Sequence, residues 1–295
     1  MNEFKNFHPV VNFVYFASVI AFSMILMHPV CVLISFVCGF AYSVMLGGTK
    51  ALKFNFACIA PLALCTAAVN PAFSHEGMTI LRYLPSGNPL TLESVVYGIA
   101  AAAMLSGVIL HFYCFNRIMT SDKLMYLSGR IIPSLSLIFS MTLRFVPRFN
   151  EQMKEVAAAQ ECMGRSVSEG SLASRAKNGV RIISVMITRC MENAVDTADS
   201  MKSRGFGLPG RTAYSNFRFT CRDAAVLAQI LVLTSYVVFG KISGQLHFVY
   251  FPKINGTAAS PLSVSCGAAY LLLCMTPIII EVGEALRWKS LKSKI

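Results

Sequence analysis

The residues best suited to specific chemistry in this sequence are two arginines that stand close to glycines. Arg204 lies in the run Ser203-Arg204-Gly205, and Arg165 follows Met163-Gly164. A guanidinium group is planar and can form two parallel hydrogen bonds with a carboxylate. At the tip of a helix, it is therefore suited to dock into an acidic groove of a partner protein. One such arginine is more often a solvated capping charge, so the hypothesis depends on finding two of them on paired helices.

The other reactive residue types form no catalytic or metal-binding set. The sequence has no G-x-x-x-x-G-K-[ST] motif, so we expect that the chain does not bind ATP and is not itself an enzyme. His75-Glu76 begins like the zinc motif H-E-x-x-H, but Thr79 occupies the position of the second histidine. The ten cysteines include no C-x-x-C pair and are expected to be free thiols. We therefore predict no cofactor, no metal and no catalytic residue.

The composition indicates that these arginines belong to a membrane protein. Hydrophobic residues make up 55% of the chain and charged residues 14%, whereas about 25% of a soluble domain is charged. Six apolar runs contain no Asp, Glu, Lys or Arg, and each is near the roughly 17–25 residues that cross a bilayer. The runs are Val10–Met27, Val30–Leu46, Phe54–Val69, Val95–Phe115, Ala224–Gly240 and Pro261–Ile280. The second and third are marginal in length, so that part of the chain could instead form a shallow hairpin.

The positive charge is concentrated between the fourth and fifth runs. Residues 116–222 hold sixteen Lys and Arg against eight Asp and Glu, which is +8 of the net charge of +12. With six spans, this segment, the Gly47-Gly48 turn and the basic C-terminal tail fall on one side, and the positive-inside rule makes that side the cytoplasm. We expect membrane helices in 1–115, a cytoplasmic module in 116–222 and further membrane helices in 223–295. Both termini are then cytoplasmic, and the membrane is the cell membrane.

Two long helices are predicted inside the cytoplasmic module. The first begins at Pro133, bends near Pro147 and ends before Gly164. The second runs from about Ala176 to Arg204 and stops at Gly205. Apolar residues at three- and four-residue spacing give the second helix one apolar stripe; they are Ile183, Met186 or Ile187, Cys190 or Met191, Ala194, Ala198 and Met201.

At these helix ends the chain resembles a known family, the transmembrane T component of energy-coupling factor (ECF) transporters, which includes the cobalt-transport permease CbiQ. Residues 198–207 are similar to the second Ala-Arg-Gly signature of that family, with Ser203 in place of the alanine. The first signature corresponds to residues 159–165, where Cys162 and Met163 replace the alanine and arginine. Whether Arg165 takes over from the missing arginine, or Met163 docks by other contacts, is left open.

The resemblance implies an all-α membrane scaffold with about six membrane helices and two long crossing coupling helices. The helix ends Ser203, Arg204, Gly205, Met163, Gly164 and Arg165 would dock on two ABC-type ATPases, as a homodimer or heterodimer. A small membrane-embedded substrate-binding subunit, the S component, would pack on the coupling helices, and ATPase motion would drive uptake of a vitamin or metal ion. The apolar platform for this subunit would be Ile131, Ile132, Leu135, Ile138 and Phe139.

Four other classes of protein fit the sequence less well. A conventional ABC permease also docks on ATPases, but it would carry its own substrate pathway, and it is the main alternative. A membrane-embedded enzyme would need convergent His, Asp, Glu or Cys, and a secondary carrier would need repeated halves or charged spans. Nucleic-acid binding is not expected, because the basic residues of the module are interspersed with acids along helices rather than clustered with aromatics.

Overall fold

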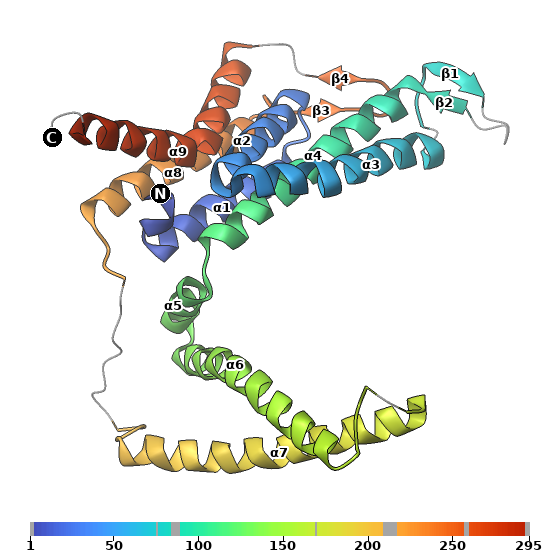
Figure 1. Cartoon of the computed structure of the whole chain (residues 1–295). Coiled ribbons are helices and arrows are strands. Elements are labelled where there is room, and N and C mark those ends of the chain that lie inside the picture. Colours follow the sequence, from blue (N-terminus) through green and yellow to red (C-terminus); the bar gives the residue numbers. More distant parts are fainter. Residues whose placement is uncertain are drawn as a thin grey trace. The chain divides into compact units, whose positions relative to one another are not determined.

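The computed structural model describes residues 3–74, 76–83, 89–168, 170–208, 217–256 and 260–292. Helices dominate these residues, as predicted for an all-α membrane protein, and two short antiparallel strand pairs are added (Figure 1). The helices are η1 (Glu3–Asn6, 3-10), α1 (Pro9–Ile25), α2 (Pro29–Phe54), η2 (Asn55–Ile59, π), α3 (Ala60–Phe73), α4 (Leu92–Ile118), α5 (Ser121–Ile131), α6 (Pro133–Cys162), α7 (Leu172–Ser203), α8 (Cys221–Ile242) and α9 (Pro261–Lys292). The strands are β1 (Ile80–Tyr83), β2 (Pro89–Thr91), β3 (Phe248–Val249) and β4 (Asn255–Gly256).

The chain divides into two compact units. The first, here called the membrane unit, comprises Met1–Leu124 and Phe217–Ile295. The second, here called the two-helix module, comprises Met125–Asn216 and contains α6 and α7.

The membrane unit contains the stretches that are long and apolar enough to cross a bilayer. In the described part of the chain there are four of them: Pro29–Phe73, Leu92–Ile118, Cys221–Ile242 and Pro261–Lys292. The apolar helix α1 is 17 residues long, or about 25 Å at 1.5 Å per residue, slightly less than the roughly 30 Å of a hydrocarbon core. The sequence placed two separate spans in 30–46 and 54–69. In the structure both runs lie within the helical stretch Pro29–Phe73, on either side of a kink at Gly48.

Gly48 forms the kink between the two runs. Its backbone has φ 56 and ψ −138, so the helical direction changes there without a loop. A residue with a side chain rarely adopts a positive φ, whereas glycine does so at little cost. Helix formation resumes directly afterwards through Lys50 to Lys53, because Lys, Ala and Leu are strong helix formers. Both α2 and α3 pack along α4 (Figure 1).

A buried hydrogen-bond network links four helices of the membrane unit. The hydroxyl oxygens of Ser23 on α1 and Ser35 on α2 lie 2.6 Å apart. Ser35 Oγ is 3.1 Å from His111 Nε2 on α4, and Ser23 Oγ is 3.3 Å from the hydroxyl of Tyr270 on α9. All four side chains are buried. Polar groups buried in this way are tolerated because each has a hydrogen-bond partner.

The segment that precedes α1 is fixed by a buried lysine. Lys123 on α5 is 4% exposed, and its Nζ donates to the carbonyl oxygens of Lys5 and Phe7. A lysine is rarely buried so completely. Burial, with a smaller contribution from the charge of Lys5, lowers the pKa of the Lys123 amine to about 8. This contact holds the segment that precedes α1 against the start of α5.

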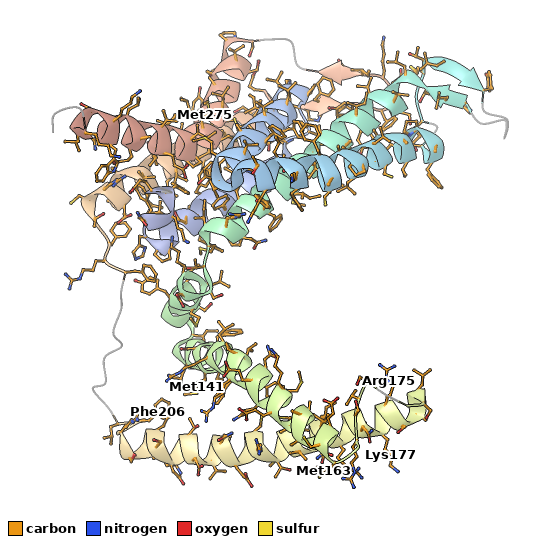
Figure 2. The ribbon with its side chains drawn as sticks, viewed as in Figure 1. Met141, Met163, Arg175, Lys177, Phe206 and Met275 are labelled. Atoms are coloured by element: carbon orange, nitrogen blue, oxygen red, sulfur yellow. The ribbon has the colours of Figure 1, made fainter. Side chains whose placement is uncertain are left out.

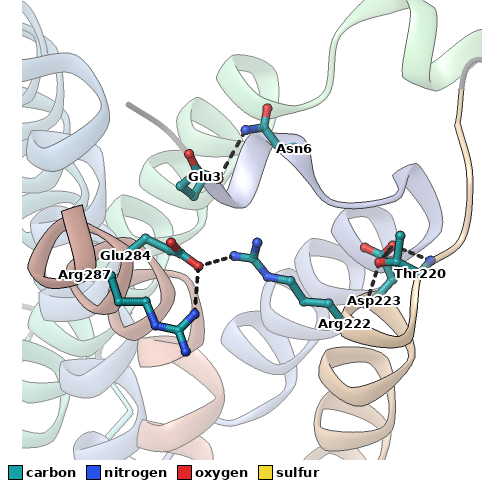
Figure 3. Close-up of polar contacts among 7 residues, drawn as sticks. All are labelled: Glu3, Asn6, Thr220, Arg222, Asp223, Glu284 and Arg287. Carbon is teal, nitrogen blue, oxygen red and sulfur yellow. Dashed lines mark hydrogen bonds and ion pairs between the residues drawn. The ribbon is translucent and has the colours of Figure 1, made fainter. Parts of the chain in front are cut away.

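The start of α8 is fixed by a reciprocal cap, shown in Figure 3. Thr220 N donates to Asp223 Oδ2 at 2.9 Å, and Asp223 N donates to Thr220 Oγ1 at 3.4 Å, so two backbone donors that the helix leaves free are satisfied. Asp223 Oδ1 also accepts from His8 N at 3.0 Å, which ties the start of α8 to the start of α1. Beside the cap, Arg222 forms an ion pair of 3.0 Å with Glu284 on α9.

Candidate functional site

The two helices predicted to carry the site are present and long. Helix α6 has 30 residues, begins with Pro133 at its first position and continues through Pro147. Helix α7 has 32 residues and begins at Leu172, four residues earlier than expected. The earlier start has a local cause, because the Ser171 hydroxyl accepts a hydrogen bond from Ser174 N at 3.3 Å and so acts as the N-cap.

A small apolar core joins α6 to α7. It consists of Val156 on α6 with Ile182 and Met186 on α7, and Ala157 and Val185 pack against it. All three core side chains are buried, Met186 to 2% exposure. The two helices therefore cross at one small contact within the module (Figure 1).

The predicted single apolar stripe of α7 is two separate faces in the structure. Ile182 and Met186 face the crossing with α6. Ile183, Ile187, Met191 and Val195 recur every four residues and are exposed, Met191 to 67%. A four-residue spacing places side chains along one side of a helix. An exposed row of large apolar side chains is typical of a surface that a partner or lipid covers.

The ends of α6 and α7 have the same backbone geometry. At the end of α6, Gly164 has φ +73, Arg165 N donates to Gln160 O at 3.0 Å and Gly164 N donates to Glu161 O at 2.9 Å. This pattern is a Schellman motif, in which a glycine of positive φ closes the last turn. The equivalent two hydrogen bonds close α7, where Gly205 has φ +76. Phe206 N donates to Met201 O at 3.0 Å, and Gly205 N donates to Lys202 O at 2.9 Å.

The matching geometry places Met163, and not Arg165, at the position of Arg204. Met163 and Arg204 each precede the glycine as the C-cap residue. Arg165 follows the glycine and therefore corresponds to Phe206. Met163, Arg165 and Arg204 are all exposed. The two ends are thus alike in backbone and different in side chain.

Both helix ends are held in place by local contacts. After α6, Arg175 Nε donates to Val167 O at 2.7 Å, and Asn178 Nδ2 donates to Ser166 O at 2.9 Å, which fixes the connecting segment to α7. At the other end, Ser203 Oγ donates to Ser200 O at 2.9 Å. Figure 2 shows Phe206 at one end of the module and Met163, Arg175 and Lys177 at the other. The two helix ends therefore lie far apart on the module.

Sequence reasoning missed a groove between the N-terminal half of α6 and the C-terminal half of α7. It has a volume of about 520 Å³. Its polar walls include Arg144 and Arg148 on α6 and Arg204 on α7. Arg144 and Arg148 are four residues apart, so the sequence indicated that they share one face of a helix. It did not indicate that this face lies opposite α7.

The predicted apolar platform is described in part. Ile132, Ile138 and Phe139 are exposed, Ile138 to 57%. The side chains of Ile131 and Leu135 lie outside the described residues. His75, from the incomplete zinc motif, lies outside them as well. Within the described ranges, no group of three His, Cys, Asp or Glu is placed to hold a metal ion.

These features define a helical membrane protein that carries a pair of long, crossing amphipathic helices with glycine-capped, exposed ends. The family model CbiQ, described as cobalt transport protein, matches residues 4–214. Because that match covers most of the chain, the protein belongs to the CbiQ family.

Among curated proteins the chain is similar to several called energy-coupling factor transporter transmembrane protein EcfT. The one from Bacillus selenitireducens is 33% identical over 111 residues, which are 37% of this chain and 41% of the relative. The one from Lactococcus lactis is 29% identical over 114 residues, 38% of this chain and 43% of the relative. The one from Staphylococcus aureus is 27% identical over 131 residues, 44% of this chain and 48% of the relative. The chain thus spans less than half the length of these relatives.

Proposed function

We propose that this chain is the transmembrane T component of an ECF-type ABC importer. It is a non-catalytic scaffold that binds two ABC-type ATPase subunits and a small S component. Its long helices α6 and α7 transmit the motion of the ATPases to the S component, which delivers a vitamin or a metal ion. Membership of the CbiQ family and similarity to EcfT proteins support this role.

The observation that carries the proposal is the pair of matched helix ends. Each presents an exposed side chain at a rigid C-cap that precedes a glycine. The ends lie at opposite sides of the module, which suits attachment to two partner subunits at once (Figure 2). Arg204 makes no ion pair with the described carboxylates, so its guanidinium is free to bind an acidic groove.

The exposed apolar surfaces suit a membrane-embedded partner. Ile132, Ile138 and Phe139 on and before α6, and the row from Ile183 to Val195 on α7, remain uncovered in the isolated chain. We assign these surfaces to contacts with the S component. The substrate would be set by that subunit and not by this chain. The excess of Lys and Arg in the module favours its placement in the cytoplasm, with both termini on the same side of the cell membrane.

The test is co-purification of the partners with variants of the two ends. Arg204→Glu is expected to abolish ATPase co-purification in mild detergent, because it reverses the charge at one docking tip. Arg181→Glu is the matched control, since Arg181 is exposed on the same helix away from its end, and it should retain the ATPases. Normal ATPase recovery with Arg204→Glu would contradict the proposal.

Variants of the other end decide which residue docks there. The geometry predicts that Met163→Glu weakens ATPase binding more than Arg165→Glu, since Met163 occupies the position of Arg204. A larger effect of Arg165→Glu would show that the arginine after the glycine takes over the contact.

A conventional permease would transport with the ATPases alone, whereas a T component requires a separate S component. Reconstituted uptake with and without that subunit distinguishes the two.

A further inference from the structure

The groove between α6 and α7 carries more positive charge than the described residues neutralise. Arg144, Arg148 and Arg204 line it together with a single carboxylate, Asp196. Among the described residues the ion pairs are those of Glu284 in the membrane unit, so none of these arginines is paired with a carboxylate. Asn193 also lines the groove and adds an amide donor. The groove therefore offers several donors to an anionic group.

An apolar pocket adjoins this groove. It has a volume of about 260 Å³ and shares Phe145, Arg148 and Asn193 with the groove. Its other walls are Phe149, Gln152, Cys190 and Ala194. The shared residues border both spaces, so the cationic groove and the apolar pocket are adjacent. A ligand that fills both must itself have an anionic end and an apolar end.

We infer that the adjacent groove and pocket bind an anionic phospholipid, with the headgroup phosphate at Arg144 and Arg148 and an acyl chain in the apolar pocket. Arginine suits a phosphate because its fork of N–H donors can bind two oxygens at once. The combined space is of the size that binds small molecules. A membrane protein always has such lipids at hand, and anionic headgroups attract clustered basic residues at the bilayer surface.

The phospholipid explains more of the site than an acidic segment of a partner protein would. An acidic segment satisfies Arg144 and Arg148 but leaves the apolar walls at Phe149 and Ala194 uncovered. A lipid covers both. The inference goes beyond the proposed function, because it requires a membrane and no ATPase or S component.

The test measures lipid retained by the purified full-length chain in native mass spectrometry. The probes are dioleoyl phosphatidylglycerol, dioleoyl phosphatidylcholine and inorganic phosphate. Wild type should retain the anionic lipid over the zwitterionic one. Arg144→Gln with Arg148→Gln should weaken phosphatidylglycerol retention by at least about tenfold, since hydrogen bonds to charged groups are lost. Arg181→Gln, an exposed arginine of α7 outside the groove, should retain the lipid as wild type does.

A second variant tests the apolar pocket separately. Ala194→Phe fills the pocket and leaves the arginines in place, so it should also lower phosphatidylglycerol retention. Far-UV circular dichroism and gel filtration confirm that each variant is folded before it is compared.

Three results would overturn the inference. One is equal retention of both lipids by wild type, or unchanged retention after the double substitution. Another is displacement of the lipid by an equal concentration of inorganic phosphate, which would assign the site to free phosphate. The third is loss of ATPase co-purification by Arg144→Gln with Arg148→Gln while lipid retention stays normal. That result would assign the arginines to an acidic protein partner.

Discussion

The crossing of α6 and α7 depends on so few side chains that one substitution should loosen it. Met186 is 2% exposed, and its described apolar neighbours at the crossing are Val156, Ile182, Ala157 and Val185. Met186→Ala removes three heavy atoms beyond Cβ. At about 0.8 kcal/mol for each buried methylene-sized group, the loss is about 2 kcal/mol, at the lower end of measured Met→Ala costs. The crossing is a small contact, so the helices can partly close the gap.

Hydrogen–deuterium exchange of the α7 amides measures this loosening directly. A loss of about 2 kcal/mol corresponds to roughly 30-fold faster exchange where local opening controls the rate. The increase should centre on the turns around residues 182–186. Met191→Ala is the matched control, because Met191 lies on the same helix and is 67% exposed. Its exchange should change by less than about twofold, since exposed substitutions cost within about 0.5 kcal/mol.

Equal exchange in the two methionine variants would refute this reasoning. It would mean that Met186 does not support the crossing, or that α7 opens independently of α6. Faster exchange in Met186→Ala with unchanged ATPase recovery would show that the crossing can loosen without weakening the proposed docking of the helix ends.

Two further outcomes follow from the geometry. Gly205→Ala should destabilise the end of α7 by about 1 kcal/mol or more, because φ is +76 and the added Cβ would lie 3.1 Å from Leu208 Cδ1. Gly164→Ala should cost less, because its Cβ would meet nothing within 4 Å. Hydrogen–deuterium exchange at the two helix ends checks which variant is destabilised more. The Lys123 amine has a pKa of about 8 in the folded chain, against 10.5 ordinarily. Between these pH values the unfolded state binds more protons than the folded state, so stability rises with pH. Lys123→Met should abolish that rise in the thermal unfolding midpoint measured in detergent, and an unchanged pH profile would contradict the burial of Lys123.

The helices and their ends could be predicted from the sequence because their signals are local. Apolar runs without charge identified the membrane helices, and glycine marked the ends at Gly164 and Gly205. The Gly47-Gly48 pair marked the change of direction between the second and third apolar runs, and Gly48 has the positive φ of a kink there. The sequence did not indicate that helix formation resumes directly after the kink, without a loop.

The details of the site depend on contacts between distant residues and had no local signal. The signature already aligned Met163 with the missing arginine and left the part of Arg165 open, and the hydrogen bonds that close α6 give Met163 the same C-cap position as Arg204. Arg144 becomes part of a groove because α7, some fifty residues further along, lies opposite it. The burial of Lys123 was equally hidden, because lysine is expected on the surface.

The hydrogen-bonded residues Ser23, Ser35, His111 and Tyr270 also constrain how the chain can be assembled during synthesis. Ser23 and Ser35 are synthesised first, and because their hydroxyls lie 2.6 Å apart in the folded chain, the two earliest helices can satisfy these groups with each other. His111 follows and finds Ser35 already in place, which avoids an unpartnered imidazole in hydrocarbon, where a bare polar group costs several kcal/mol. Tyr270 arrives last and binds Ser23. Each polar side chain therefore meets its partner in the order in which the ribosome releases them, and a chain truncated before α9 leaves the first three residues of the network paired.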